Sequence, residues 1–305
     1  MDHLNAILAN ARRWVDESSR IVVLTGAGIS TDSGIPDFRG PQGVWTKNPQ
    51  AEKLSNIHYY MTDPGVRKLA WRNRLEHPAW RAVPNAGHEA LVQLERRARL
   101  LAVVTQNIDG LHQRAGNSPD LVIEVHGTVH EVICMRCGAR GPMQETLGRV
   151  RRGEEDPPCL GCGGILKSAT ISFGQALVPE VIERAARAAA DADLFMAAGT
   201  SLQVYPVAGL LPLAKKAGAR VIIVNAESTP MDHLADAIIS DPISEVLPLL
   251  CEEPLGERAP RASHASGAGP WGPRPSTGAR GALSLVEGRE RACKGVRGTK
   301  SPDEK

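Results

Sequence analysis

The chain has 305 residues, and its formal net charge of +2 argues against nucleic-acid binding by phosphate neutralisation. Hydrophobic residues make up 42% and aromatic residues only 4%, which favours a core of aliphatic side chains in which helices cover a parallel sheet. No signal-like segment and no apolar run of about 18 residues is present, so we expect a cytoplasmic protein without membrane spans.

Short apolar segments alternate with helical patterns along most of the chain. Apolar residues at helical spacing from Leu4 to Val15 predict an amphipathic first helix, and a second helix is predicted at 86–97 with Asn85 as N-cap. This β-α-β repetition predicts an α/β fold, a Rossmann-like doubly wound parallel sheet whose ligand crevice lies at the carboxyl ends of the strands. The predicted strands are 21–25, 101–105, 121–125, 194–198 and 221–224.

Two segments interrupt the repetition, and we predict that both are insertions that build a smaller zinc-containing lobe. One is a helical insertion at 41–84, and the other is a zinc module at 129–170. The larger lobe would then comprise residues 1–40, 85–128 and 171–251, so that one catalytic domain spans 1–251. Residues 252–305 are rich in Pro, Gly, Ser and Arg without periodicity, which predicts a disordered tail.

Four cysteines form two Cys-x-x-Cys pairs with 21 residues between them. This spacing is typical of a tetrahedral four-thiolate zinc site, and four protein ligands leave no position open for water. We therefore expect a structural zinc ion, with an iron–sulfur cluster or redox pairs as the alternatives. The predicted ligands are Cys134, Cys137, Cys159 and Cys162.

The loop after the first predicted strand is glycine-rich. Gly26-Ala27-Gly28 would let the backbone approach a pyrophosphate, although an ordinary tight turn is the alternative. The dehydrogenase fingerprint is absent, because Thr31 stands where its third glycine belongs. Asp37, Phe38 and Arg39 follow, and this unusual set indicates a ligand loop unless the charged pair merely lies on the surface.

Polar residues also follow the later strands, where α/β enzymes hold their ligands. Amide and carboxylate groups at 106–109 suit ribose hydroxyls and a carboxamide, unless they only cap the next helix. His126 is the leading candidate base, with His88, His112 and His130 as competitors. The predicted phosphate and ribose contacts on the remaining strands are Gly199, Thr200, Ser201 and Asn225.

Taken together and in order, the motifs GAGIST..SGIPDFRG, TQNIDGLH, EVHG, the paired Cys-x-x-Cys, SFG, GTSLQV and VIIVN resemble the sirtuin family of NAD-dependent protein deacylases over residues 21–250. The resemblance implies that Asp109 and the backbone of Ile108 hold the nicotinamide carboxamide, and that Gln106 and Asn107 contact the nicotinamide ribose. Ala237 would contact adenine, although the sequence departs from the family pattern near Asp241. The substrate peptide would add as a strand between Phe173-Gly174 and the segment from Leu202 to Val204.

The same resemblance implies the reaction. An acyl-lysine in an extended segment of another protein and NAD would yield nicotinamide, O-acyl-ADP-ribose and free lysine, with His126 taking a ribose hydroxyl proton. Ala70 and Asn73 occupy the positions where desuccinylating members carry Tyr and Arg, so we predict acetyl or other uncharged acyl groups as substrates. Gln175 replaces the usual acid after Phe-Gly.

Other activities would fit the same nucleotide site. Mono-ADP-ribosyl transfer to protein or removal of lipoyl groups is the first alternative, and a non-catalytic module that binds NAD and zinc is the second. Product analysis distinguishes the first from deacylation, and a variant of His126 distinguishes the second. We expect the enzyme to be a monomer.

Overall fold

The computed structural model describes residues 2–37, 40, 43 and 51–253. Its largest element is a six-stranded sheet in the order β3-β2-β1-β7-β8-β9, and the paired strands are all parallel. The order reverses direction beside β1, which is the doubly wound topology that the sequence predicts. The strands are β1 (Ile21–Thr25), β2 (Leu100–Thr105), β3 (Val122–Glu124), β7 (Leu194–Ala198), β8 (Arg220–Val224) and β9 (Ala237–Ile239).

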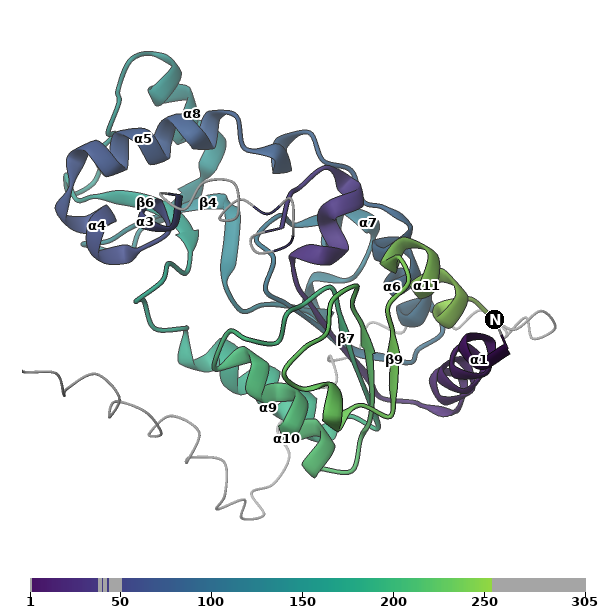
Figure 1. Cartoon of the computed structure of the whole chain (residues 1–305). Coiled ribbons are helices and arrows are strands. Elements are labelled where there is room, and N and C mark those ends of the chain that lie inside the picture. Colours follow the sequence, from purple (N-terminus) through teal and green to yellow (C-terminus); the bar gives the residue numbers. More distant parts are fainter. Residues whose placement is uncertain (1, 38–39, 41–42, 44–50, 254–305) are drawn as a thin grey trace, which may run out of the picture. The chain divides into compact units, whose positions relative to one another are not determined.

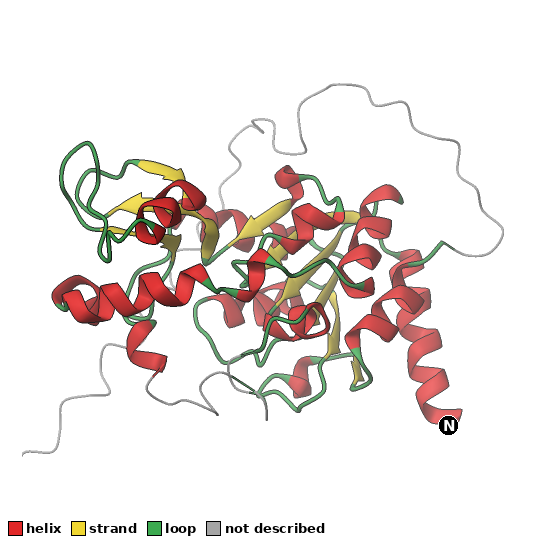
Figure 2. Cartoon of the chain, turned by 90° about the horizontal axis from the view of Figure 1, so that it is seen from above, coloured by secondary structure: helices red, strands yellow, loops and turns green. Residues whose placement is uncertain are grey.

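Helices cover both faces of this sheet (Figures 1 and 2). Side chains of a strand alternate between the faces, so Ile21 and Val23 of β1 enter one core while Val22 and Leu24 enter the other. The first core is covered by α1 (Asp2–Glu17), α6 (Ala86–Arg96) and α11 (Ile243–Cys251). The second is covered by α9 (Pro179–Asp191) and α10 (Leu210–Lys216).

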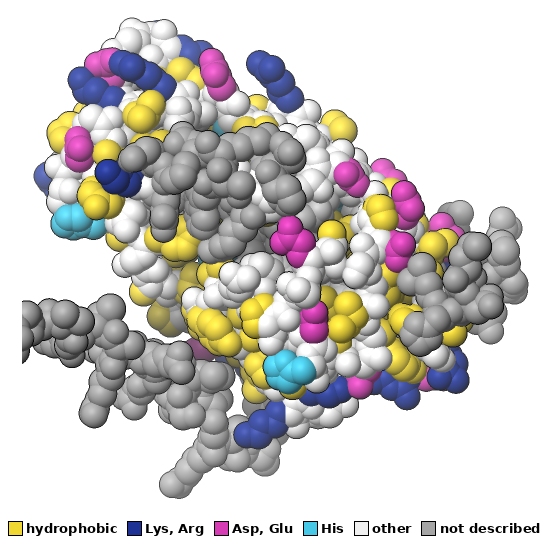
Figure 3. Space-filling model, viewed as in Figure 1, with side chains coloured by type: hydrophobic (Ala, Val, Ile, Leu, Met, Phe, Trp, Pro, Cys, Tyr) yellow, Lys and Arg dark blue, Asp and Glu magenta, His cyan; other side chains and the backbone are white. Residues whose placement is uncertain are grey.

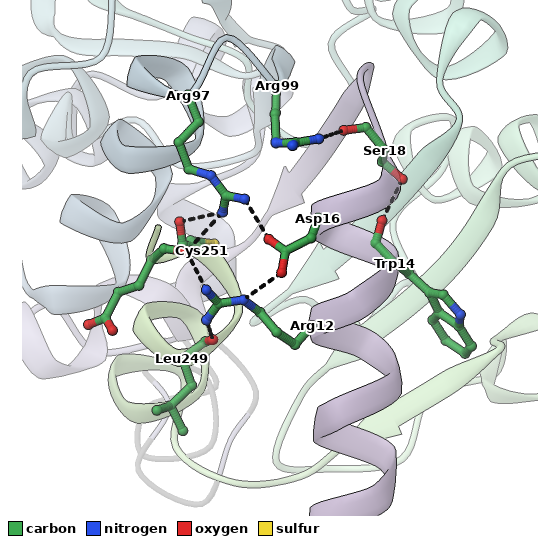
Figure 4. A network of polar contacts seen from close by, with 9 residues as sticks. Arg12, Trp14, Asp16, Ser18, Arg97, Arg99, Leu249 and Cys251 are labelled. Carbon is green, nitrogen blue, oxygen red and sulfur yellow. Dashed lines mark hydrogen bonds and ion pairs between the residues drawn. The ribbon is translucent and has the colours of Figure 1, made fainter. Parts of the chain in front are cut away.

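Two arginines hold the carboxyl end of α11 (Figure 4). Arg97 donates to the carbonyl oxygen of Cys251 at 2.9 Å, and Arg12 donates to the carbonyl of Leu249. Asp16 of α1 lies between them and pairs with both guanidinium groups. The last carbonyls of a helix have no partner within it, so these cations fix α11 against α1 and α6.

A second, antiparallel sheet of order β5-β4-β6 forms the smaller lobe. Trp71, from the 41–84 segment, packs into one core with Val132, Met143 and Leu166 of the 129–170 segment. The two predicted insertions thus share a core. Its elements are α3 (Ala51–Leu54), α4 (Ile57–Thr62), α5 (Pro64–Leu75), β4 (Gly127–Cys134), β5 (Arg140–Pro142), α8 (Met143–Arg151) and β6 (Leu166–Thr170).

Short helical turns complete the described chain. No membrane-spanning helix is found among the described residues. On the face drawn in Figure 3, basic and acidic side chains are interspersed among apolar ones. The short elements are η1 (Ala27–Ser33), η2 (Pro78–Trp80), α7 (Leu111–Ala115), η3 (Pro119–Leu121), η4 (Val207–Gly209) and η5 (Asp232–Leu234).

Candidate active site

Most of the predicted nucleotide contacts meet at one edge of the parallel sheet. Thr25 pairs with Thr105 and with Ala198, and Ala198 pairs with Val224, so the carboxyl ends of these strands are level. The loops that leave these strands therefore lie together at the edge where doubly wound sheets bind their ligands, and this edge is called the crevice. They carry Gly26, Ala27, Gly28, Gln106, Asn107, Ile108, Asp109, Gly199, Thr200, Ser201 and Asn225.

His126 lies beside these loops, in the turn between β3 and β4. Its Nδ1 is 3.0 Å from the backbone carbonyl oxygen of Gln106. A carbonyl oxygen only accepts hydrogen bonds, so Nδ1 carries the proton of the neutral ring and Nε2 keeps its lone pair. Burial lowers the pKa of His126, and the hydrogen bond to Gln106 opposes this with a smaller effect. At neutral pH the ring is therefore a base whose lone pair lies on Nε2.

The competing histidines have structural roles. His88 and His112 are buried, and burial lowers their pKa to about 4 and about 3 respectively. The Nε2 of His130 lies 2.8 Å from the backbone carbonyl oxygen of Asp109 and donates to it. His126 differs from His88 and His112 in being only partly buried, and from His130 in having an Nε2 without a partner among the described residues.

Two amide side chains have their orientation fixed by hydrogen bonds. Asn107 uses both amide hydrogens, which go to the carbonyl of Gly26 and the hydroxyl of Ser30, each at 3.0 Å. Gln106 donates from Nε2 to the hydroxyl of Thr200 at 2.9 Å. The carbonyl oxygens of both amides are left with no donor among the described residues.

Asp109 is 4% exposed, and its carboxylate is only partly satisfied. It accepts hydrogen bonds from the hydroxyl of Ser30 at 2.8 Å and from the backbone N–H of Leu111 at 2.9 Å. A carboxylate has about four acceptor positions, so two remain. Together with the amide oxygens and the Nε2 of His126, the crevice therefore presents acceptors, which suit a ligand that brings hydroxyl and amide hydrogens.

The glycines of the first loop pack against a second loop. A Cβ atom added to Gly26 would lie 2.6 Å from the carbonyl oxygen of Gly199, and one added to Gly28 would lie 2.7 Å from the Cα of Gly199. The N–H groups of Gly26 and Gly28 donate to the carbonyls of Ala198 and Gly199. Of the three residues predicted to contact pyrophosphate, only Ala27 keeps an N–H without an acceptor among the described residues.

The structure separates some predicted contacts from the others. Asp37 accepts a hydrogen bond from the backbone of Gly40 at 2.8 Å, while Phe38 and Arg39 lie outside the described residues. Ala237 begins β9 two residues before the carboxyl edge and is buried in the core, so it does not line the crevice.

Phe173 follows β6 and pairs with the 41–84 insertion. Its N–H donates to the carbonyl of Ser55 at 2.8 Å, and its carbonyl accepts from the N–H of Ile57 at 3.0 Å. The N–H of Phe173 is therefore already used in this arrangement, while its carbonyl oxygen keeps a second lone pair and its side chain is 41% exposed. Neither contact with the insertion was predicted from the sequence. Gly174 has a left-handed backbone with a φ of 81°.

Val204 lies in the other loop predicted to bind the peptide. It is half-buried, and its carbonyl accepts the N–H of Ala208 at 2.9 Å. Its own N–H has no acceptor among the described residues.

The four predicted zinc ligands converge. Their sulfur atoms all lie within 4.8 Å of one another, and the Sγ atoms of Cys134 and Cys162 are 3.5 Å apart. Zn–S bonds of about 2.3 Å in a tetrahedron place the sulfurs about 3.8 Å apart, so the four thiolates fit a zinc ion.

The backbone around the thiolates is shaped for a metal. Gly138 and Gly163 both have left-handed backbone and donate to the carbonyls of Cys134 and Cys159, so the two turns repeat one geometry. A Cβ atom on Gly164 would lie 2.8 Å from the Sγ of Cys134. Cys134 and Cys159 also belong to the core of the small lobe, so a bound ion would join that core, as predicted for a structural ion.

A model of the Sir2 family matches residues 26–206. The chain belongs to the Sir2 family. Among its relatives, NAD-dependent protein deacetylase 2 of Streptomyces coelicolor is 53% identical over 230 residues, which cover 75% of this chain and 95% of that protein. NAD-dependent protein deacetylase 1 of Pyrobaculum aerophilum is 43% identical over 242 residues, covering 79% of this chain and 92% of that protein.

Solved Sir2 structures share the fold. A Sir2 variant with a deacetylated p53 peptide and 3′-O-acetyl-ADP-ribose has a TM-score of 0.73 and 33% identity, covering 80% of this chain and 96% of that one. A Sir2 complex with a p53 peptide and NAD+ has a TM-score of 0.69 and 35% identity, covering 77% of this chain and 93% of that one. The resemblance drawn from the motifs is thus confirmed.

Sequence reasoning missed several residues of this Sir2 site. The hydroxyl of Ser30 hydrogen-bonds to both Asn107 and Asp109. The hydroxyls of Thr25 and Thr105 hydrogen-bond to each other at the strand ends beside this loop. Ser30 lies within the motif GAGIST, but a serine in a turn does not by itself indicate a functional role. The two threonines end apolar strands, and only the sheet register brings their hydroxyls together.

Proposed function

We propose that this Sir2 protein is an NAD-dependent protein-lysine deacetylase that releases nicotinamide, O-acetyl-ADP-ribose and free lysine. The observation that carries the proposal is the set of unsatisfied acceptors at the crevice, which comprises the oxygens of Gln106, Asn107 and Asp109 and the Nε2 of His126. Ribose hydroxyls and a carboxamide NH2 are the donors that such a set selects.

NAD, when bound, supplies a ribose carbon that the acyl oxygen of the substrate attacks as nicotinamide leaves. Asp109 would hold the carboxamide by its two remaining acceptor positions, and the oxygen of Asn107 would accept from a ribose hydroxyl. His126 would then take a ribose hydroxyl proton on Nε2, because its Nδ1 proton is held by the carbonyl of Gln106, so that this hydroxyl could attack the acyl carbon. One water would be consumed as the acyl group passes to the ribose and the lysine amine leaves.

The names of the relatives support an acetyl substrate, and two features of the chain agree with uncharged acyl groups. Ala70 on α5 is buried and Asn73 is neutral, so neither offers a cation to an acidic acyl group. An unpaired carboxylate in a buried channel is costly. We therefore expect succinyl-lysine to be a poor substrate.

The test is a panel of one peptide that bears acetyl-, propionyl- or succinyl-lysine, incubated with and without NAD and followed by mass spectrometry. We expect NAD-dependent loss of the acetyl group, slower loss of propionyl and little loss of succinyl. A peptide that gains the mass of ADP-ribose and keeps its acyl group would instead identify a transferase. A protein that leaves every peptide unchanged would contradict catalysis altogether.

A further inference from the structure

A buried chain of hydroxyl groups runs beneath the loop of residues 107–109. Thr25 and Thr105 end β1 and β2, are 0% and 2% exposed, and their hydroxyl oxygens are 2.8 Å apart. The Oγ1 of Thr105 also accepts the backbone N–H of Asn107 at 3.1 Å. One end of this chain of hydrogen bonds is therefore the backbone of the 107–109 loop.

His112 of α7 forms the other end. Its ring is 1% exposed, and Nε2 lies 3.0 Å from the Oγ1 of Thr25. Because burial lowers the pKa of His112 to about 3, the ring is neutral at neutral pH. Thr25 donates its only hydroxyl hydrogen to Thr105, so its oxygen accepts from the Nε2–H of His112.

This proton order leaves Nδ1 of His112 as a bare acceptor, and Nδ1 has no hydrogen-bond partner among the described residues. Thr25 is therefore the only hydrogen-bond partner of this ring among the described residues, while the ring of His88 packs beside it with the centroids 5.0 Å apart. The stability that this single hydrogen bond adds is offset by the cost of burying Nδ1 without a partner. A leucine would therefore fill the core equally well, so packing alone does not explain a histidine here.

The side chains of the 107–109 loop make further hydrogen bonds, to Ser30 and to the backbone next to His112. The side chain of Asn107 donates to Ser30, and Ser30 donates to the carboxylate of Asp109. The backbone N–H of Leu111, next to His112, donates to the other oxygen of that carboxylate. A shift of His112 or of the hydroxyls would therefore be passed to Asn107 and Asp109, the two side chains of this loop assigned to the crevice.

We propose that His112, acting through Thr25 and Thr105, positions the 107–109 loop for the nicotinamide end of NAD. The inference rests on the proposed function, in which that loop holds the carboxamide. His112 touches no substrate in this account, so it is a positioning residue. The loss of one buried neutral hydrogen bond in this chain should weaken binding of the nicotinamide end about fivefold.

The experiment breaks the chain at two points without changing side-chain volume greatly. Thr25→Val removes the central hydroxyl, and His112→Leu removes the terminal donor. We expect each variant to raise the KM for NAD and the Ki of nicotinamide together, about fivefold, with kcat changed less than about twofold. The Kd of ADP-ribose, which lacks nicotinamide, should change less than about twofold.

Conservative variants and a double variant separate positioning from simple loss of packing. Thr25→Ser and His112→Gln keep a hydroxyl or an N–H donor in place and should restore both constants toward wild type. The double variant Thr25→Val with His112→Leu should raise the KM for NAD and the Ki of nicotinamide no further than the single variants do, because both substitutions interrupt the same chain of hydrogen bonds. Thr146→Val, which changes a buried threonine in α8, should leave all three constants unchanged.

Two results would overturn the inference. One is equal weakening of ADP-ribose and nicotinamide, and the other is a wild-type Ki for nicotinamide in folded Thr25→Val and His112→Leu proteins. Failure of the proposed function is distinguishable from both, because the wild-type protein itself would then remove no acetyl group.

Discussion

The close approach of the two glycine loops makes a prediction about stability in the absence of any nucleotide. In Gly28→Ala, the new Cβ would lie 2.7 Å from the Cα and 3.0 Å from the carbonyl oxygen of Gly199. Both are backbone atoms, so the loops must separate. Such overpacking typically costs about 1–3 kcal/mol, and the free energy of unfolding should fall by that amount.

Urea unfolding followed by tryptophan fluorescence, without NAD, measures this change. Gly148→Ala is the matched control, since Gly148 lies inside α8 and its added Cβ would meet only the flexible end of Arg152 at 3.6 Å. That variant should be stabilised by about 0.5–1 kcal/mol. If Gly28→Ala unfolds like the wild-type protein and only binds nucleotide more weakly, then Gly28 serves the ligand and not the packing of the loops.

Four further predictions concern catalysis, the metal and the scaffold. His126→Ala should lower kcat at least about 100-fold while the Kd of NAD measured by calorimetry stays near wild type; lost NAD binding would make His126 structural. Because burial lowers the pKa of His126, the decline of kcat/KM on the acid side should be centred below the ordinary histidine value of 6.5, and a decline centred above 6.5 would contradict the assignment of the base. Removing zinc with a chelator should loosen the core that contains Trp71 and Cys159 and abolish activity, and a metal-free protein that keeps both its activity and its melting temperature would refute the structural role. Arg97→Met should lower the free energy of unfolding by about 1–3 kcal/mol, because Asp16 and the carbonyl of Cys251 lose a charged donor. The control Arg13→Met, at a side chain 62% exposed, should change it by less than about 0.5 kcal/mol. Equal effects of the two arginine variants would show that Arg97 does not hold α11.

The parallel sheet could be predicted from the sequence because its central strands are continuous apolar runs buried on both faces. β1 and β7 coincide with the predicted segments, and β2 and β8 each begin one residue earlier than expected. β9 was not predicted, because its three residues stand alone, whereas the equally short β3 lies within the longer predicted segment 121–125. The antiparallel sheet of the small lobe was missed for a different reason: β5 has only three residues and β6 carries Lys167 and Ser168, so neither forms an apolar run.

The site was predictable where chemistry is local and unpredictable where it depends on distant contacts. The Cys-x-x-Cys pairs are recognisable from their spacing, and their four sulfurs converge. The polar residues after the strands are recognisable from their position, and they meet at one edge of the sheet. The pairing of Phe173 with Ser55 and Ile57 joins segments more than 100 residues apart, and no local pattern indicates it. The packing of Gly28 against Gly199 likewise depends on how two loops meet, so no local pattern indicates it, and the contact of Gly28 with pyrophosphate stays a prediction.

The most direct test of the account is the ratio of products formed by the wild-type protein from an acetylated peptide and NAD. If His126 acts as the base that completes acyl transfer to the ribose, then nicotinamide, O-acetyl-ADP-ribose and deacetylated peptide appear in equal amounts. Nicotinamide released with plain ADP-ribose, or with an intact acetyl group on the peptide, would contradict it.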